Sequence, residues 1–122
     1  MSRLRLELLQ WFGLLAAPLA WATHLVLGYY LLLAHCATKG WHEGWSPTQI
    51  ALTATAAAIA LLAEAAASTV YVELARVGRD APGPRGRQRF FAIGGMVGDL
   101  LFLVAILVTG LSLVTAQACR QS

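Results

Sequence analysis

The chain has little charge for its length. Of its 122 residues, only 12% are Asp, Glu, Lys or Arg, whereas 58% are hydrophobic. An average soluble domain carries about twice this share of charged residues. The composition therefore excludes an ordinary soluble domain and predicts an integral membrane protein.

Recognisable catalytic motifs are also missing. The sequence has no pairing of a nucleophile with a general base, no phosphate-binding loop and no internal repeat. Autonomous enzymes need such a constellation of side chains to perform chemistry. We therefore expect that the protein is not an enzyme.

Three apolar runs use most of the chain, covering about residues 11–34, 50–72 and 90–116. Each run reaches the roughly 20 residues that a helix needs to cross a bilayer. Arginines precede the first run, as in a signal peptide, but the run is too long for one, so we expect it to be retained. The predicted fold is all-α: residues 1–122 form one domain, a bundle of three transmembrane helices.

Basic residues predict the orientation of this bundle. Arg3 and Arg5 precede the first span, and only Lys39 and Arg120 fall on the opposite side. The loop of about residues 76–89 adds five arginines: Arg76, Arg79, Arg85, Arg87 and Arg89. Because basic loops stay cytoplasmic, we expect the N-terminus inside and the C-terminus outside in a multi-pass protein of a bacterial inner (plasma) membrane. The positive charge then reflects topology and contact with anionic membrane lipid, and no nucleic-acid partner is expected.

Three ionisable residues lie at membrane depth: His24, Glu64 and Asp99. Such residues are costly in hydrocarbon and face a bundle interior or a polar cavity. Taking the midpoint of each span and the helical rise, their depths fall within about one or two turns of one another, so we expect an intramembrane polar cluster. Two interpretations stay open: His24 pairs with one carboxylate and fixes helix register, or the three residues form a proton relay. Haem ligation by His24 is a further alternative that needs a second histidine from another chain.

Small residues indicate where helices approach one another. The second span is rich in alanine, so we expect it to be the helix most covered by protein. Gly94 and Gly98 on the third span have the small-xxx-small spacing that seats a neighbouring helix. We expect Gly94, Gly98 and the alanine face to make the contacts with partner subunits.

Two cysteines, Cys36 and Cys119, lie at the predicted outer ends of the first and third helices. An even cysteine count on the oxidising side favours a disulfide between them. His35 and His42 lie nearby in the sequence, so the alternative is a copper or zinc site formed by His35, Cys36, His42 and Cys119. We favour the disulfide because no Cys-x-x-Cys spacing is present.

Several stretches carry a resemblance. Residues 13–25 (GLLAAPLAWATHL) with a cysteine after the first span, and residues 89–95 (RFFAIGG) leading through 107–110 (LVTG) to a terminal cysteine, resemble small bacterial membrane proteins associated with haem-copper terminal oxidases. This resemblance implies a non-catalytic accessory subunit or assembly protein of a respiratory terminal oxidase such as cytochrome c oxidase. It implies no catalytic residues in this chain, and we expect no cofactor.

The residues leave two other functions open. One is a copper- or haem-handling membrane protein that uses the outer histidines and cysteines, or His24, as ligands. The other is a small proton-coupled transporter that uses His24, Glu64 and Asp99. Three helices are few for a transport path, so the transporter would have to act as an oligomer.

Overall fold

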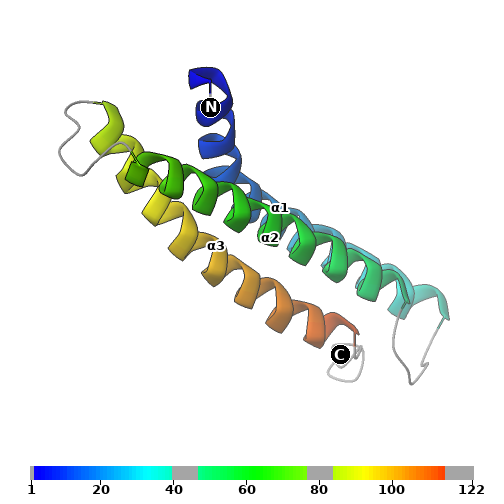
Figure 1. Cartoon of the computed structure of the whole chain (residues 1–122). Coiled ribbons are helices and arrows are strands. Elements are labelled where there is room, and N and C mark those ends of the chain that lie inside the picture. The colour runs from blue at the N-terminus through cyan, green and yellow to red at the C-terminus, as the bar shows by residue number, and fades with distance from the viewer. Residues whose placement is uncertain (1, 40–46, 77–83, 115–122) are drawn as a thin grey trace.

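Three long helices make up the fold. The computed structural model describes residues 2–39, 47–76 and 84–114, with side chains for residues 2–34, 47–76 and 86–112. The helices are α1 (Arg3–Lys39), α2 (Pro47–Arg76) and α3 (Pro84–Val114). Each helix packs along the other two, as Figure 1 shows. The predicted all-α fold with three helices is confirmed.

All three helices are long and apolar enough to cross a membrane. Mean hydropathy is 1.4 for Arg3–Ala34, 1.9 for Pro47–Arg76 and 2.4 for Gly86–Ser112. Only 28%, 28% and 22% of the most apolar stretch of each span is buried inside the bundle. Most of each helix therefore faces outward, as expected for helices whose solvent is lipid.

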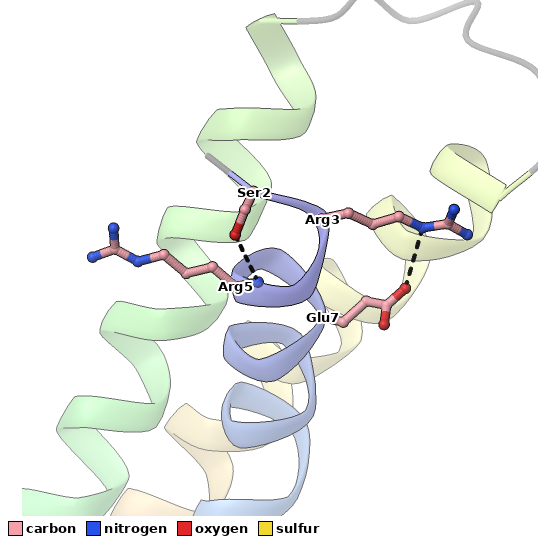
Figure 2. Close-up of polar contacts among 4 residues, drawn as sticks. All are labelled: Ser2, Arg3, Arg5 and Glu7. Atoms are coloured by element: carbon pink, nitrogen blue, oxygen red, sulfur yellow. Dashed lines mark hydrogen bonds and ion pairs between the residues drawn. The ribbon is translucent and has the colours of Figure 1, made fainter.

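The first helix begins before the apolar run that predicts it. Ser2 accepts a hydrogen bond on Oγ from the backbone N–H of Arg5, with 3.3 Å between the two atoms (Figure 2). This is the N-cap arrangement that supplies a partner to an otherwise unpaired first-turn N–H. One turn further, the Arg3 Nε and Glu7 Oε1 atoms lie 3.5 Å apart. The polar arm therefore extends the helix beyond the apolar run.

The second helix begins as the sequence indicates. Pro47 is its first residue, while the expected cap, Ser46, lies outside the described residues. The helix ends at Arg76, whose guanidinium lies 3.7 Å from the Glu73 carboxylate. Proline lacks a backbone N–H donor. This costs little at the first helical position, where the N–H has no partner within the helix, so proline is tolerated there.

The third helix corrects the predicted extent of the basic loop. The sequence places the loop at about residues 76–89, but α3 begins at Pro84, so Arg87 and Arg89 are helical. Proline has a φ angle that suits a helix. It has no backbone N–H, but the N–H of the first helical residue would have no partner within the helix, so proline is favoured at this position. Arg89 then lies over the ring of Tyr71 on α2, 5.6 Å from its centroid.

Arginines gather at one end of the bundle. The start of α1, the end of α2 and the start of α3 lie at this end, and the end of α1, the start of α2 and the end of α3 lie at the other (Figure 1). The N-terminal part of α1, drawn in blue, runs at an angle to the other two helices, and its Leu6 and Leu9 side chains pack against a cluster formed by Val70, Leu74 and Ala92. This charge asymmetry is the feature on which the predicted orientation depends.

Small residues set the helix spacing. The buried alanines of α2 face both neighbours: Ala56, Ala60, Ala63, Ala66 and Ala67. The expectation that α2 is the most covered helix agrees with its eight buried residues, against six among the described residues of α1 and five among those of α3. In a bundle of three, every helix has two neighbours, and the small alanine side chains let both of them approach α2 closely.

The three helices come closest at Gly13, Ala67 and Gly95. A Cβ atom at Gly13 would lie 2.9 Å from the backbone nitrogen of Ala67, and one at Gly95 would lie 3.2 Å from the carbonyl oxygen of Gly13. Only glycine allows this approach of α1 to both other helices. The three residues therefore fix the register of the bundle, and we call them the glycine junction.

A buried amide joins α1 to α2 near the opposite end. The Gln49 side chain donates a hydrogen bond from Nε2 to the carbonyl oxygen of Gly28 over 2.9 Å, and the residue is 3% exposed. We expect Gln49→Leu to lower the free energy of unfolding in detergent by about 1 kcal/mol, because the interhelical hydrogen bond is lost. Thermal unfolding followed by circular dichroism measures this, with the exposed neighbour substitution Thr48→Ala as control. Equal stabilities of the two variants would contradict the prediction.

Candidate functional site

Two acidic side chains, on α2 and α3, lie within electrostatic reach of each other. Asp99 is 2% exposed and Glu64 is partly buried. The two carboxyl groups lie close enough for their charges to interact. Glu64 Oε2 and Asp99 Oδ2 are both buried without a hydrogen-bond partner. The predicted polar cluster therefore exists in part, as an acidic pair.

No described cation neutralises this acidic pair. Among the residues whose side chains the structure describes, the ion pairs are Arg3 with Glu7 and Arg76 with Glu73, both at the arginine-rich end. Arg89 precedes Asp99 by ten residues on α3, which is about 15 Å along a helix. Two like charges without a counter-ion repel strongly in a low-dielectric interior. The pair can therefore take a proton, or a cationic group from outside this chain.

The third ionisable residue, His24, lies elsewhere. It is 1% exposed, and its Nε2 atom forms a hydrogen bond with Thr53 Oγ1 at 3.0 Å. Its Nδ1 atom is buried without a partner. Thr53 also fills the space in front of Gly110, where a Cβ atom would contact the threonine side chain. His24, Thr53 and Gly110 therefore form a second layer, which involves all three helices.

Three helical turns separate the two polar layers. Thr53 and Glu64 are eleven residues apart on α2, and so are Asp99 and Gly110 on α3. Eleven residues correspond to about 16 Å along a helix. The expectation that all three ionisable residues lie within one or two turns of one another in depth is therefore wrong for His24. It is correct for the Glu64 and Asp99 carboxyl groups. Accordingly, His24 bonds to Thr53 and to neither carboxylate.

Apolar side chains fill the space between the layers. Buried Ala20, Ala60 and Ile106 belong to one hydrophobic cluster there. The Trp21 and Phe102 rings pack beside it with centroids 5.6 Å apart. A proton relay from His24 to the acidic pair would have to cross this cluster, so the geometry does not support a relay through all three residues.

Two grooves flank the layer formed by His24, Thr53 and Gly110. One, of about 330 Å³, lies between α1 and α2 and includes His24 in its wall. The other, of about 280 Å³, lies between α2 and α3 and includes Thr53 and Gly110. The imidazole–threonine contact thus lies between two apolar grooves. Thr53 has only a weak sequence signal, a hydroxyl group among alanines in an apolar span.

The predicted outer site lies beyond the described side chains. This applies both to the disulfide between Cys36 and Cys119 and to the metal alternative with His35 and His42. Within the part of the chain that the structure describes, no group of three His, Cys, Asp or Glu residues could hold a metal ion. The disulfide and the outer copper or zinc site therefore stay predictions.

Gly94 and Gly98 do not pack against the part of α1 or α2 that the structure describes. A Cβ atom at either position would meet nothing within 4 Å. The adjacent Gly95 faces α1 instead, because successive helical residues point about 100° apart. The predicted role of Gly94 and Gly98 in contacts with a partner stays a prediction, and the structure leaves both glycines open.

Together, these features define a three-helix bundle of membrane-spanning dimensions with an acidic pair on one interface and a histidine–threonine contact on another. No protein-family model, curated protein or solved structure matches the chain. Inference about function therefore begins from the residues and their geometry.

Proposed function

We propose that the protein is a non-catalytic accessory subunit or assembly protein of a larger membrane complex, and that this complex is a respiratory haem-copper terminal oxidase. The observation that carries the proposal is the open glycine surface, defined here as Gly94 and Gly98 of α3. Among the described residues of α1 and α2, nothing lies within 4 Å of a Cβ atom at either glycine. Glycines four residues apart allow a second helix to approach closely in a membrane.

The position of the open glycine surface supports docking. It lies on the helix with the highest mean hydropathy, 2.4, and the smallest buried share, 22%. Exposed Val97 and Leu101 lie beside it on α3. Large apolar side chains beside small residues give a helix surface with a groove, which a partner helix fills by van der Waals contact.

The identity of this complex, a terminal oxidase, is the more specific part of the proposal. It is supported by the resembling stretches at residues 13–25, 89–95 and 107–110, and by the arginines that predict a cytoplasmic N-terminus in a bacterial inner membrane. Terminal oxidases reside in that membrane. The partners would then be oxidase subunits and lipid, with the haem and copper in those subunits.

Combining Gly94→Ile with Gly98→Ile is expected to reduce partner recovery at least about tenfold. A tenfold change corresponds to about 1.4 kcal/mol of binding free energy, and two isoleucines would hold the helices apart. The bundle itself would fold normally because nothing in it contacts these positions. The measurement is quantitative mass spectrometry of proteins that co-purify with the tagged chain from its native membrane.

The matched control places the same side chains on another lipid-facing surface. Ala58 and Ala65 are exposed on α2, so Ala58→Ile with Ala65→Ile changes the same kind of surface elsewhere. We expect this control to recover the partner at the unaltered level. Equal recovery with both double variants, or equal loss, would contradict docking at the open glycine surface.

A proton-coupled transporter is the second candidate, and the acidic pair is the observation that favours it. Glu64 and Asp99 have buried oxygens without partners, as a proton-binding site in a membrane does. The transporter would act as an oligomer, and His24 would not take part because the apolar cluster separates it from the pair. Proton uptake by reconstituted vesicles that Glu64→Gln leaves unchanged would remove this candidate.

A further inference from the structure

The polar arm at the start of α1, residues 2–10, has one face against the bundle and the opposite face outward. Its Leu6 and Leu9 side chains pack against the cluster formed by α2 and α3 residues. On the opposite face, an apolar stripe begins in the arm and continues along α1. We call it the outer stripe, and its members with their exposed fractions are Leu4 (67%), Leu8 (62%), Trp11 (57%) and Leu15 (47%).

The outer stripe follows one line along the helix. Its members are three or four residues apart, which places them on a single helical face. Eleven residues separate the first member from the last, which corresponds to about 16 Å along the helix axis. One leaflet contributes about half of the roughly 30 Å hydrocarbon core, so the outer stripe matches the length of a phospholipid acyl chain.

Two arginines flank the outer stripe. Successive helical residues point about 100° apart, so Arg3 and Arg5 lie on either side of Leu4. Figure 2 shows their side chains extending in opposite directions from the helix. Arg3 Nε lies 3.5 Å from Glu7 Oε1, whereas no carboxylate among the described residues forms an ion pair with Arg5. Arg5 therefore presents a charge without a described counter-ion beside the apolar stripe.

The helix that carries the outer stripe is longer than the hydrocarbon core of a membrane. The 37 residues of α1 correspond to about 55 Å along its axis, whereas the core is about 30 Å thick. Arg3, Arg5 and Glu7 lie within its first five residues, and the apolar run begins at Trp11. Because charged side chains are costly in hydrocarbon, the arm lies at the headgroups. The outer stripe therefore runs from the headgroup level into the hydrocarbon.

We propose that Arg5 and the outer stripe bind one anionic phospholipid, with the lipid phosphate on the Arg5 guanidinium and an acyl chain along the stripe. A guanidinium donates two parallel hydrogen bonds to phosphate oxygens. Trp11 provides an amphipathic ring of the kind that packs at the boundary between headgroups and chains. Among the described side chains at this end of the bundle, five arginines outnumber two glutamates, namely Arg3, Arg5, Arg76, Arg87 and Arg89 against Glu7 and Glu73. This charge favours a lipid with net negative charge over a zwitterionic one.

The inference goes beyond the accessory role, because the lipid site belongs to this chain alone. The outer stripe is on α1, whereas the open glycine surface is on α3. Lipid binding is therefore expected in the isolated protein, and the two proposals can fail separately.

The test uses native mass spectrometry of the purified whole chain in mild detergent to compare its affinities for phosphatidylglycerol and phosphatidylcholine with the same acyl chains. Phosphatidylglycerol is expected to bind at least about fivefold more tightly, which is the contribution of roughly one arginine near a membrane surface. Arg5→Gln is expected to remove this preference. Equal affinities of the unaltered protein for the two lipids would overturn the proposal.

Arg3→Gln is the matched control for Arg5→Gln. It removes the same charge from the same arm, but from a guanidinium that is already paired with Glu7. We expect this variant to keep most of the preference for phosphatidylglycerol. An equal loss of preference in both variants would show only a diffuse attraction by the arginine-rich end, and would overturn the assignment of the phosphate to Arg5.

A second pair of variants tests the apolar half of the site. Leu8→Ser is expected to weaken the binding of both lipids about fivefold, because the acyl chain loses part of its apolar contact. Leu62→Ser is the control, since Leu62 is on α2, outside the outer stripe, and is 60% exposed against 62% for Leu8. Both side chains are exposed, so both variants are expected to keep the bundle intact. Equal effects of the two substitutions would overturn binding along the outer stripe.

Discussion

Gly13→Ile is expected to lower the free energy of unfolding of the bundle by about 3 kcal/mol, the upper part of the usual range for overpacking. A Cβ atom at Gly13 would lie 2.9 Å from the backbone nitrogen and 3.1 Å from the Cα atom of Ala67. Backbone atoms cannot move aside as a flexible side chain does, so α1 and α2 must separate. Unfolding in detergent, followed by circular dichroism, measures the loss.

Gly94→Ile is the control for this prediction. It introduces the same side chain into a helix of the same bundle, at a position where a Cβ atom meets nothing within 4 Å. We expect a change of less than about 0.5 kcal/mol, as for surface substitutions in general. A destabilisation of similar size in both variants would show that the glycine junction does not set the helix spacing.

Asp99→Leu is expected to raise the free energy of unfolding by about 2 kcal/mol. Insertion of an aspartate at the centre of a membrane helix costs about 2.5–3.5 kcal/mol. Asp99 is 2% exposed, has a buried oxygen without a partner and lies within electrostatic reach of Glu64. Leucine removes both the desolvation cost and the repulsion. The measurement is again the unfolding midpoint in detergent.

Glu73→Leu provides the comparison for Asp99→Leu. Glu73 is on α2 and pairs with Arg76 at the end of the bundle, so its carboxylate has a counter-ion. No gain in stability is expected there. A gain at Asp99 alone would identify the acidic pair as a feature retained at a cost to the fold, which is typical of functional sites in membranes. A loss of stability at Asp99 would contradict this account of the pair.

Hydropathy alone predicts the three helices, because a span in lipid needs about 20 apolar residues whatever its neighbours are. The same reasoning predicts that His24 and Asp99 face inward, and both are buried. The ends of the helices are less predictable from hydropathy. Ser2 and Pro84 extend α1 and α3 through local backbone chemistry that an average over many residues does not detect.

The relative depth of the helices could not be predicted, because tertiary contact sets it. In the glycine junction, Gly13 of α1 lies beside Gly95 of α3. His24 follows Gly13 by eleven residues, whereas Asp99 follows Gly95 by only four, so the two residues lie at different depths. Midpoints of the apolar runs instead place the two residues within about one or two helical turns of each other. Local sequence also does not reveal that Gly95, rather than Gly94 or Gly98, meets α1.

Native-membrane purification of the tagged chain in a mild detergent tests the central claim most directly. The eluate is analysed by visible spectroscopy, metal content and mass spectrometry of the proteins recovered. The proposal predicts oxidase subunits together with their haem absorption bands, both reduced when Gly94 and Gly98 are replaced by isoleucine. A chain that is recovered alone, without other subunits and without colour, would contradict it.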